Sequence, residues 1–465
     1  MSEPVYNSIQ ELLDQLKTGC GHTFSELDVN HRLTGEARND KGALGKIVEE
    51  GVFHYSVNSR PEADFANLGV ELKTTGYNKT RNGLSFKERL PLNTFNYQKV
   101  ENQKFEDSDM WHKCQQLLIA LYEYLDGKTY GEMTLDSGFY HTFTPADIEV
   151  IKSDYNLLQN KIKSGKANTI SQRDTNYLEA CTAGAGHGKV DANATAHYGV
   201  DLKPRKFALK PAYMTGVLRR LFSNGEIESV VDYEELKTKT IEEVITDRMS
   251  YYVGKDEDYF KNLIAGEEEP KNRFERYAAK MLGIKGIIND ADEFVKANII
   301  CKTIRVEENG NIEQNMSFPA FSFLDVANQE WEDSDFREMM INRKFMFVIF
   351  KKINGKYQFS KVKFWSIPED ILDTAGRKVF DELKEVLLSG NIVRGFRTDK
   401  NGKTIRLNNF PKSASNPYIH IRPHGEDSSD TNPLPVPDRL TGATEYTKQC
   451  FWLKKSYILQ VINEE

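Results

Sequence analysis

The chain has 465 residues, of which 39% are hydrophobic and 11% aromatic, and only 15 are prolines. This composition excludes a disordered or fibrous protein, and the length predicts two or three domains, of which we take two. The net charge of -7 argues against indiscriminate binding to polyanions, and the absence of a signal peptide or an eighteen-residue apolar run predicts a cytoplasmic protein without a membrane segment.

The first predicted elements are two helices. The segment "SIQELLDQLK" is read as a helix, and "DKGALGKIVEEG" places apolar side chains on one helical face from Leu44 to Val48, with Gly51 as its expected end. Glu49 or Glu50 in this second helix is then placed to turn toward a site formed by the next segment.

That next segment, "PEADFANLGVELKTT", reads as a turn that enters a strand. Because side chains alternate along a strand, Val70 and Leu72 are expected to face the core, while Glu71 and Lys73 face a cleft or solvent. A turn at "PEAD" would bring the carboxylate of Asp64 beside that of Glu71. The alternative is a solvated strand face with an exposed Glu–Lys ion pair.

Two converging carboxylates suit Mg²⁺, which accepts one or two of them and fills its shell with water and phosphate oxygens. Lys73 would then orient or help to deprotonate the attacking water and neutralise charge that develops on a phosphorus centre. Asp64, Glu71 and Lys73 together therefore predict hydrolysis of a phosphodiester.

Further along the chain, "WHKCQQLLIALYEYL" is predicted as a helix, and "KFMFVIFKK" and "VKFWSIP" as strands. The basic run "KPRKFALK" is expected to contact DNA phosphates. Its candidate contacts are Lys203, Arg205, Lys206 and Lys210. Five scattered cysteines without metal-ligand spacing predict reduced thiols.

Three blocks recur in the same order, which indicates a duplicated fold. The pairs are "LSFKERLPLNTFNYQKVENQKFEDSDM" with "MSFPAFSFLDVANQEWEDSDF", "YLEACTAGAG" with "YIHIRPHGED", and "FALKPAYMTGVL" with "FWLKKSYILQVI". We therefore predict domains at 1–230 and 231–465. Each is expected to be α/β (α+β) with a mixed central sheet.

"PEADFANLGVELKT" and "KGALGKIVEE" resemble the MutH family of nucleases, which includes the mismatch-repair nicking enzyme MutH and Sau-type restriction endonucleases that recognise GATC. The resemblance implies two tandem restriction-endonuclease-like domains of the PD-(D/E)xK kind and Mg²⁺-dependent cleavage of double-stranded DNA. It assigns the catalytic carboxylates and lysine to Asp64, Glu71 and Lys73. The family's helical glutamate falls on Glu49, with Glu50 as the alternative.

The same resemblance implies other DNA-contacting residues. Lys41 would lie near the bound strand, and Lys113 of "MWHKCQQLL" would contact the scissile phosphate. One departure is Ala183, which stands where MutH-like proteins have a base-contacting lysine, so base readout would fall to His187 or Lys189.

The second copy is predicted to have lost catalysis. Ile300 falls opposite Glu71, and Gly283 falls opposite the helical glutamate. Arg422 and Lys454 would preserve a DNA-contacting surface, which makes this half a DNA-binding or regulatory domain. The alternative is a packing partner only.

These observations predict a type II restriction endonuclease whose N-terminal half cuts duplex DNA at a short palindrome, GATC by resemblance. A MutH-like strand-nicking repair enzyme and a non-catalytic DNA-binding protein are the alternatives. Sensitivity to methylation, the cut position, the residues that read the bases, and the choice between dimerisation and two-site engagement on DNA stay open.

Overall fold

The computed structural model describes residues 4–34, 42–57, 62–80, 83–86, 88–125, 127–183, 189–222, 227–264, 272–398, 402 and 404–464. Its contacts divide the chain into two compact units, Met1–Asp247 with Gly283–Ile299 and Arg248–Leu282 with Ile300–Glu465. The division into domains at residue 230 stays a prediction. Within the described ranges, no helix has both the length and the apolar character needed to cross a membrane.

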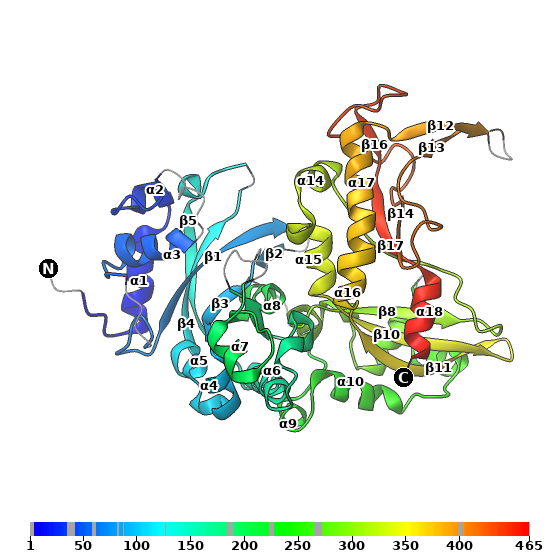
Figure 1. Cartoon of the computed structure of the whole chain (residues 1–465). Helices are drawn as coiled ribbons and strands as arrows, with labels where there is room; N and C mark the ends of the chain where they lie inside the picture. Colours follow the sequence, from blue (N-terminus) through cyan, green and yellow to red (C-terminus); the bar gives the residue numbers. More distant parts are fainter. Residues whose placement is uncertain are drawn as a thin grey trace. The chain divides into compact units, whose positions relative to one another are not determined.

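The first unit contains two sheets. Its strands are β1 (Glu71–Thr80), β2 (Gly83–Phe86), β3 (Leu90–Phe95), β4 (Gln116–Glu123), β5 (Leu135–Thr142), β6 (Leu178–Thr182) and β7 (Arg205–Leu209). One sheet has the order β2-β1-β4-β5 and is mixed, because β1 pairs with β4 in parallel while the outer pairs are antiparallel. The other is the antiparallel sheet β3-β7-β6. Figure 1 shows β4 between β1 and β5.

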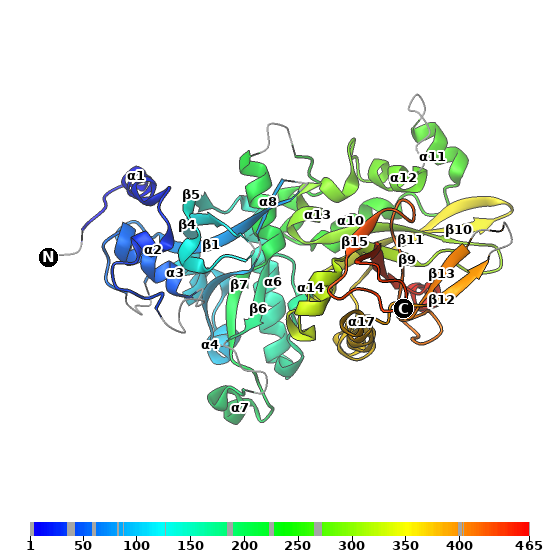
Figure 2. The same ribbon diagram turned by 90° about the horizontal axis from the view of Figure 1, so that it is seen from above.

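Helices cover these sheets. They are α1 (Ile9–Gly19), α2 (Phe24–Leu27), α3 (Gly42–Ile47), α4 (Tyr97–Asn102), α5 (Asp109–Cys114), α6 (Pro145–Lys163), α7 (Ala192–Tyr198), α8 (Pro211–Phe222), α9 (Tyr233–Leu236), α10 (Ile241–Ser250) and α13 (Asp292–Lys296), with a π-helix η2 (Val48–Val52) and 3-10 turns η3 (Phe105–Asp107), η4 (Tyr130–Glu132), η5 (Ala167–Thr169), η6 (Gln172–Asp174) and η7 (Ile288–Asp290). The predicted first helix is confirmed as α1, which Ser8 caps and which packs against β5. Figure 2 shows α6 beside β6 and β7.

The prediction of one helix across "WHKCQQLLIALYEYL" is wrong. Helix α5 ends at Cys114, and the chain continues as β4 from Gln116. The side chains from Leu117 to Tyr122 are all buried, so both faces of the inner strand β4 are covered. A strand buried on both faces reads as a continuous apolar run, which periodicity does not separate from a buried helix.

The second unit has the strands β8 (Ile299–Val306), β9 (Met316–Ala320), β10 (Lys344–Ile353), β11 (Lys356–Trp365), β12 (Val393–Thr398), β13 (Thr404–Asn408), β14 (Ile419–Pro423), β15 (Thr431–Pro433), β16 (Glu445–Thr447) and β17 (Gln449–Leu453). Its helices are α11 (Glu257–Leu263), α12 (Arg273–Met281), α14 (Phe323–Asn328), α15 (Asp335–Ile341), α16 (Glu369–Ile371), α17 (Arg377–Ser389) and α18 (Lys455–Asn463), with η8 (Trp331–Asp333) and η9 (Leu372–Gly376). These strands form two three-stranded sheets, β11-β10-β8 and β14-β17-β9, and two two-stranded ribbons, β12-β13 and β15-β16.

The strand orders confirm the internal repeat that the sequence predicts. The order β1-β4-β5 recurs as β8-β10-β11, and β3-β7-β6 recurs as β9-β17-β14. The second and third repeated blocks fall on matching elements, a strand of the second sheet and a strand followed by a helix, and so does the end of the first block. The start of the first block does not, because Leu84–Phe86 lies in β2 whereas Met316–Phe318 lies in β9. Both halves therefore share an α/β arrangement in which the same order of strands recurs.

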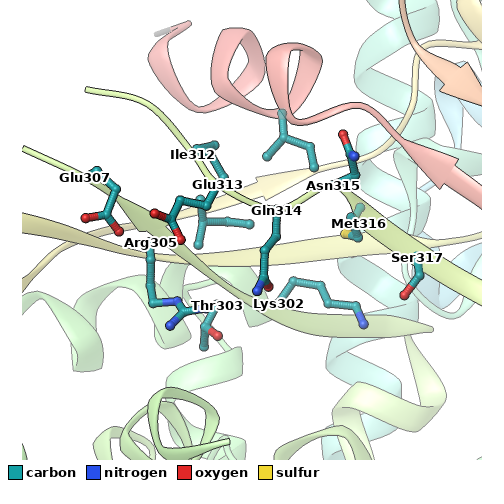
Figure 3. A pocket seen from close by; sticks show the side chains of 12 residues that line it. Lys302, Thr303, Arg305, Glu307, Ile312, Glu313, Gln314, Asn315, Met316 and Ser317 are labelled. Carbon is teal, nitrogen blue, oxygen red and sulfur yellow. The ribbon is translucent and has the colours of Figure 1, made fainter. Parts of the chain in front are cut away.

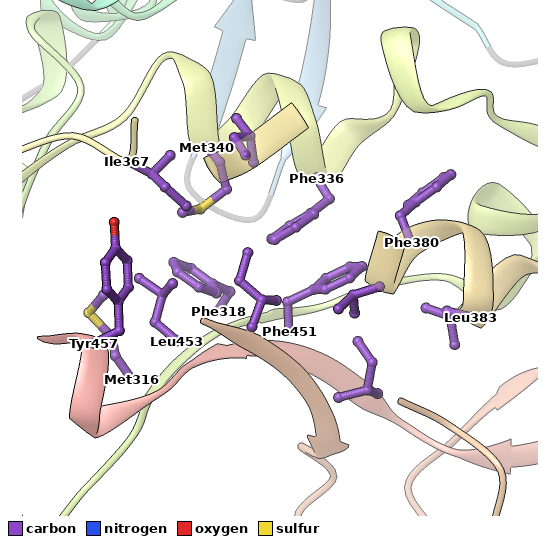
Figure 4. Close-up of a cluster of buried hydrophobic side chains, with 14 of the residues drawn as sticks. Met316, Phe318, Phe336, Met340, Ile367, Phe380, Leu383, Phe451, Leu453 and Tyr457 are labelled. Atoms are coloured by element: carbon purple, nitrogen blue, oxygen red, sulfur yellow. The ribbon is translucent and has the colours of Figure 1, made fainter. Parts of the chain in front are cut away.

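The core of the second unit is rich in aromatic rings. Figure 4 shows Phe336 of α15 lying face to face with Phe451 of β17, and their centroids are 3.6 Å apart with an interplanar angle of 9°. Phe318 and Leu453 extend the same cluster. Phe451, which recurs in the first half as Phe207, is a core residue in both positions.

A buried ion cluster holds α13 within the first unit. Lys296 Nζ lies 2.7 Å from Asp147 Oδ1 and 2.8 Å from Asp292 Oδ2, and the side chains of this cation and both acids are at most 5% exposed. Arg220 also contacts Asp292, at 2.8 Å. A fragment that starts at residue 231 would therefore separate α13 from Asp147 and Arg220, so tests of the second half need the full chain.

We expect the substitution Lys296→Met to lower the free energy of unfolding by about 3 kcal/mol, because it leaves two buried carboxylates without their shared cation. Urea denaturation followed by circular dichroism measures this change. The matched control is Lys239→Met, which removes an exposed ion pair with Asp247 and should leave the free energy of unfolding nearly unchanged. Equal losses in the two variants would contradict the role of the cluster.

Candidate active site

Asp64 and Glu71 are brought together by a tight turn at the start of β1. Phe65 and Val70 form an antiparallel bridge, and Gly69 between them has a φ of +67°, a conformation that favours glycine. The Asp64 amide donates to Glu71 Oε2 at 3.2 Å, and the Leu72 amide donates to Asp64 Oδ2 at 2.9 Å. The two carboxylates predicted to converge do so.

Two lysines meet the same carboxylate. Lys73 Nζ lies 2.7 Å from Glu71 Oε1, and Lys113 Nζ lies 3.5 Å from that atom. The parallel pairing of β1 with β4 sets Glu71 opposite Leu117, which brings the end of α5 close to the site. Glu71 is only 3% exposed. The pair therefore does not fit the alternative of a solvated strand face.

The two candidates for the helical glutamate, Glu49 and Glu50, both lie in the π-helix η2, but their surroundings differ. The Glu50 carboxylate accepts hydrogen bonds from Arg32 Nε and Arg32 Nη2, so both of its oxygens are paired with that guanidinium. Burial, followed by the charges of Asp64 and Glu71, raises the pKa of Glu49 to about 7. Glu49 therefore shares the electrostatic environment of the site, whereas Glu50 faces Arg32. A π-turn shifts the side chains by one position relative to an α-helix, and such turns occur often at functional sites.

Gly51 has a different role from the expected helix end. A Cβ at this position would lie 2.1 Å from the backbone oxygen of Leu27. The residue thus allows η2 to pack closely against the end of α2, and this contact helps to fix the direction in which Glu49 points.

Arg32 is a residue that sequence reasoning missed. It lies 18 positions before Glu50, and no short-range pattern connects the two. Its guanidinium makes a bidentate ion pair, the geometry that distinguishes arginine from lysine.

The charge of the site fits a divalent cation. Burial, and then Glu71, raises the pKa of Asp64 to about 6, so the carboxylates crowd one another where a cation would neutralise them. Among the described residues, no three His, Cys, Asp or Glu side chains gather closely enough to form a complete metal cage. Two carboxylates with open positions suit Mg²⁺, which keeps several waters and adds substrate oxygens.

Lys73 is held as a cation. Burial lowers its pKa, but Glu71 and the other groups beside it raise it more, so the pKa of Lys73 lies above its ordinary value. It therefore serves better to neutralise or donate to an anion than to remove a proton from water.

Two of the basic residues predicted to contact DNA are structural instead. Arg205 is buried and donates to the backbone oxygens of Ala180 and Ile170, both at 2.6 Å. Lys210 is 4% exposed and donates to the backbone oxygens of Gln172 and Thr175. Both predictions are corrected, because a phosphate cannot reach side chains that already satisfy buried carbonyls.

The remaining basic candidates of the first unit differ in position. Lys189, Lys203 and Lys206 are exposed, and Lys206 lies on β7. Lys41 and His187 lie outside the described residues. Phosphate contact by the exposed lysines stays a prediction.

In the second unit, Arg422 is exposed on β14 and lies over the ring of Trp452, 5.4 Å from its centroid. Lys454 donates to the backbone oxygens of Ser413, at 2.8 Å, and Asn416, at 3.3 Å. Lys454 is therefore corrected from a free DNA contact to a residue that fixes the loop before β14.

The start of β8 carries the remains of the same strand entrance, with Asn298 in the first unit and Ile300 in the second. Asn298 has a φ of +50°, as Gly69 does at +67°, and each stands one residue before a buried aliphatic side chain. This match sets Ile300 opposite Glu71 and Lys302 opposite Lys73. Lys302 lines a pocket of about 190 Å³ together with Arg305 and Gln314 (Figure 3). No carboxylate on β8 replaces that of Glu71.

We expect Glu49→Gln to raise the melting temperature of the metal-free protein by about 2 °C, because it removes like-charge repulsion. An acid whose pKa is raised on folding destabilises the fold as pH rises from its ordinary pKa to its folded pKa. The gain should therefore be small at pH 5 and complete above about pH 7. Differential scanning fluorimetry in EDTA measures it.

Glu50→Gln is the matched control with the opposite sign. Its hydrogen bonds with Arg32 lower the pKa of Glu50, so the pair stabilises the fold above the ordinary pKa of a glutamate. Its loss should lower the melting temperature at pH 7. Shifts of the same sign in both variants would contradict the assignment of Glu49 to the site.

Known proteins resemble the chain to different extents. Residues 53–154 match the family model of MutH, the DNA mismatch repair enzyme. The chain is 29% identical to the type II restriction enzyme Sau3AI of Staphylococcus aureus over 99% of both chains. DNA mismatch repair protein MutH of Vibrio campbellii is 26% identical and aligns with 49% of this chain and 100% of its own length. The corresponding protein of a Shewanella species is 23% identical over 46% of this chain and 96% of its own. The chain therefore resembles the MutH family over residues 53–154, and it is similar to a Sau-type restriction enzyme along nearly its whole length.

Proposed function

We propose that the chain is a type II restriction endonuclease that hydrolyses phosphodiester bonds of double-stranded DNA at GATC in the presence of Mg²⁺. The observation that carries this proposal is the cluster around Glu71, where a second carboxylate and two lysines meet at one buried position. The resemblance to the staphylococcal restriction enzyme along nearly the whole chain supports it. We place its action in the cytoplasm, where its DNA substrate would be met.

In this proposal Asp64 and Glu71 would hold the Mg²⁺ ion, which accepts one or two carboxylates. When bound, the ion supplies Lewis-acid activation of the phosphate and of the attacking water. Lys73, held protonated by Glu71, orients the water and neutralises charge on the phosphate as the bond breaks. Lys113 contacts the scissile phosphate from the end of α5.

The second unit would act as a DNA-binding and regulatory domain without catalysis. Ile300 offers no ligand for a cation, while the fold that surrounds it is retained. The exposed Arg422 offers a cation to a phosphate. Binding of DNA by this unit would then be coupled to cleavage by the first unit, through a free energy shared between two sites.

A strand-nicking enzyme is the second candidate, because the MutH family model covers the segment that contains Asp64, Glu71 and Lys73. The MutH relatives align with only about half of this chain, which favours the restriction enzyme. A supercoiled plasmid separates the two, since a nicking enzyme would accumulate open circles without linear product.

We expect Asp64→Asn, Glu71→Gln and Lys73→Met each to reduce the cleavage rate of a GATC-containing plasmid by at least about 1,000-fold, a loss of about 4 kcal/mol of transition-state stabilisation. Agarose gels of timed digests in Mg²⁺ measure the rate. Ca²⁺ should support binding with little cleavage, because its larger and looser shell orients the water poorly.

The control for this series is Lys79→Met, which removes an exposed ion pair with Glu123 farther along β1. Its rate should stay within twofold of the wild type. Near-normal cutting by any of the three site variants would overturn the assignment of that residue, and unaltered plasmid with the wild type would overturn the proposed activity.

We also expect plasmids with two GATC sites to be cut faster per site than plasmids with one, because the second unit would occupy one site while the first unit cuts the other. A short duplex that contains the site, added to the one-site plasmid, should restore the faster rate. Equal rates with one and two sites, and no effect of the added duplex, would show that the second unit is only a scaffold.

A further inference from the structure

A polar pocket of about 430 Å³ lies at the start of β14 in the second unit. The described residues that line it are Asn315, Asn408, Lys412, Ser413, Ala414, His420, Ile421, Arg422, Pro423 and Gln449. No acidic side chain is among them. Two are cations, Lys412 and Arg422, so the lining suits an anion.

The floor of this pocket holds a buried side chain without a partner. His420 is 0% exposed, and neither of its ring nitrogens has a hydrogen-bond partner among the described residues. A buried polar group in this state destabilises a fold, so its presence calls for a binding partner that the free chain lacks. Gln449 is similar, because its Nε2 donates to the Thr447 backbone oxygen at 2.9 Å while its Oε1 has no partner.

In the first unit, the position equivalent to that of His420 is occupied by Glu179. In the first unit, Glu179 comes directly after Leu178, which pairs with Leu209. In the second unit, His420 comes directly after Ile419, which pairs with Leu453. The two residues are therefore equivalent in register.

In the first unit the Glu179 carboxylate is neutralised from within the fold, since Arg89 Nε lies 3.2 Å from Glu179 Oε1. Arg89 stands just before Leu90, which pairs with Leu209, and Asn315 stands just before Met316, which pairs with Leu453. The internal ion pair of the first unit has thus become a histidine and an asparagine in the second unit. Asn315 carries no charge, and its Oδ1 accepts a hydrogen bond from the Lys455 amide at 2.9 Å.

The charges around His420 are positive. Burial, followed by the charges of Arg422 and Lys454, lowers the pKa of His420 to about 4. The imidazole is therefore neutral at pH 7 and carries one N–H donor. Arg422 is held flat over Trp452, which leaves the edge of its guanidinium able to donate.

We propose that this pocket binds a phosphate group of the DNA backbone, with Arg422 and Lys412 as its cations and the His420 N–H as its buried donor. The proposal rests on the proposed DNA binding by the second unit and names the place where that contact occurs. A water or a base amino group beside the phosphate would satisfy Gln449 Oε1. The first unit has an ion pair inside the fold at this position. In the second unit, the corresponding ion pair forms with a DNA phosphate, and only when DNA is bound.

The test uses the full chain in EDTA, so that no cutting occurs, with a fluorescent duplex that contains GATC. Anisotropy titrations over a range of NaCl concentrations give the affinity and its dependence on salt. Arg422→Gln should weaken binding about tenfold and reduce the slope of log K against log salt by about 1, as the loss of one phosphate contact predicts. Lys361→Gln, at an exposed lysine on β11 away from the pocket, should change neither value.

His420→Leu gives the sharper result. It should weaken binding of the duplex about fivefold and, in the same protein without DNA, raise the melting temperature, because it removes a buried polar group that lacks a partner. A histidine with a purely structural role would lose stability on this change. A fall in melting temperature, or unchanged affinity in both variants, would overturn the proposal.

Inorganic phosphate distinguishes the source of the anion. If phosphate at millimolar concentration stabilises the wild type but not Arg422→Gln, while both bind the duplex equally, the pocket holds free phosphate and the proposal for DNA is overturned. Failure of the wild type to bind the duplex at all would instead contradict the proposed function, which separates the two outcomes.

Discussion

A buried carboxylate that is paired with two lysines is the constraint on which the first unit depends. Glu71 is nearly inaccessible, and an unpaired charge at such a position is costly. Lys73 offsets that cost from the same strand, and Lys113 does so from the end of α5. The parallel pairing of β1 with β4 makes the second contact possible, because it brings the α5 terminus level with the start of β1. The mixed sheet is therefore part of the site.

The site also retains repulsion that the fold does not resolve. Asp64 and Glu49 both have raised pKa values, first from burial and then from neighbouring carboxylates. A protein selected for stability alone would remove one of these acids. Their retention is understood if a cation is present during function, because it would convert the repulsion into binding free energy.

The second unit avoids the repulsion between carboxylates because it lacks the buried acid. On β8 the buried acid is replaced by Ile300, and the strand entrance is kept through Asn298, which lies in the first unit. The cost of an unsatisfied polar group then appears elsewhere, at His420, where the first unit has an internal ion pair. The first unit thus keeps crowded carboxylates around Glu71, and the second unit keeps a buried polar group without a partner at His420. We assign each place to a different part of DNA recognition.

The sequence by itself determined the internal repeat, the α/β class and the convergence of Asp64, Glu71 and Lys73, because these depend on local alternation, turn chemistry and repeated blocks. It did not distinguish the buried strand β4 from a helix, since the apolar run of an inner strand has no period that marks it. Only the tertiary structure shows that Glu50 is paired with Arg32, while Glu49 lies within reach of the charges of Asp64 and Glu71. It also decided that Arg205 and Lys210 satisfy buried carbonyls. In each of these cases the outcome depends on which groups distant in the sequence become neighbours, and charge or hydropathy along the chain does not contain that information.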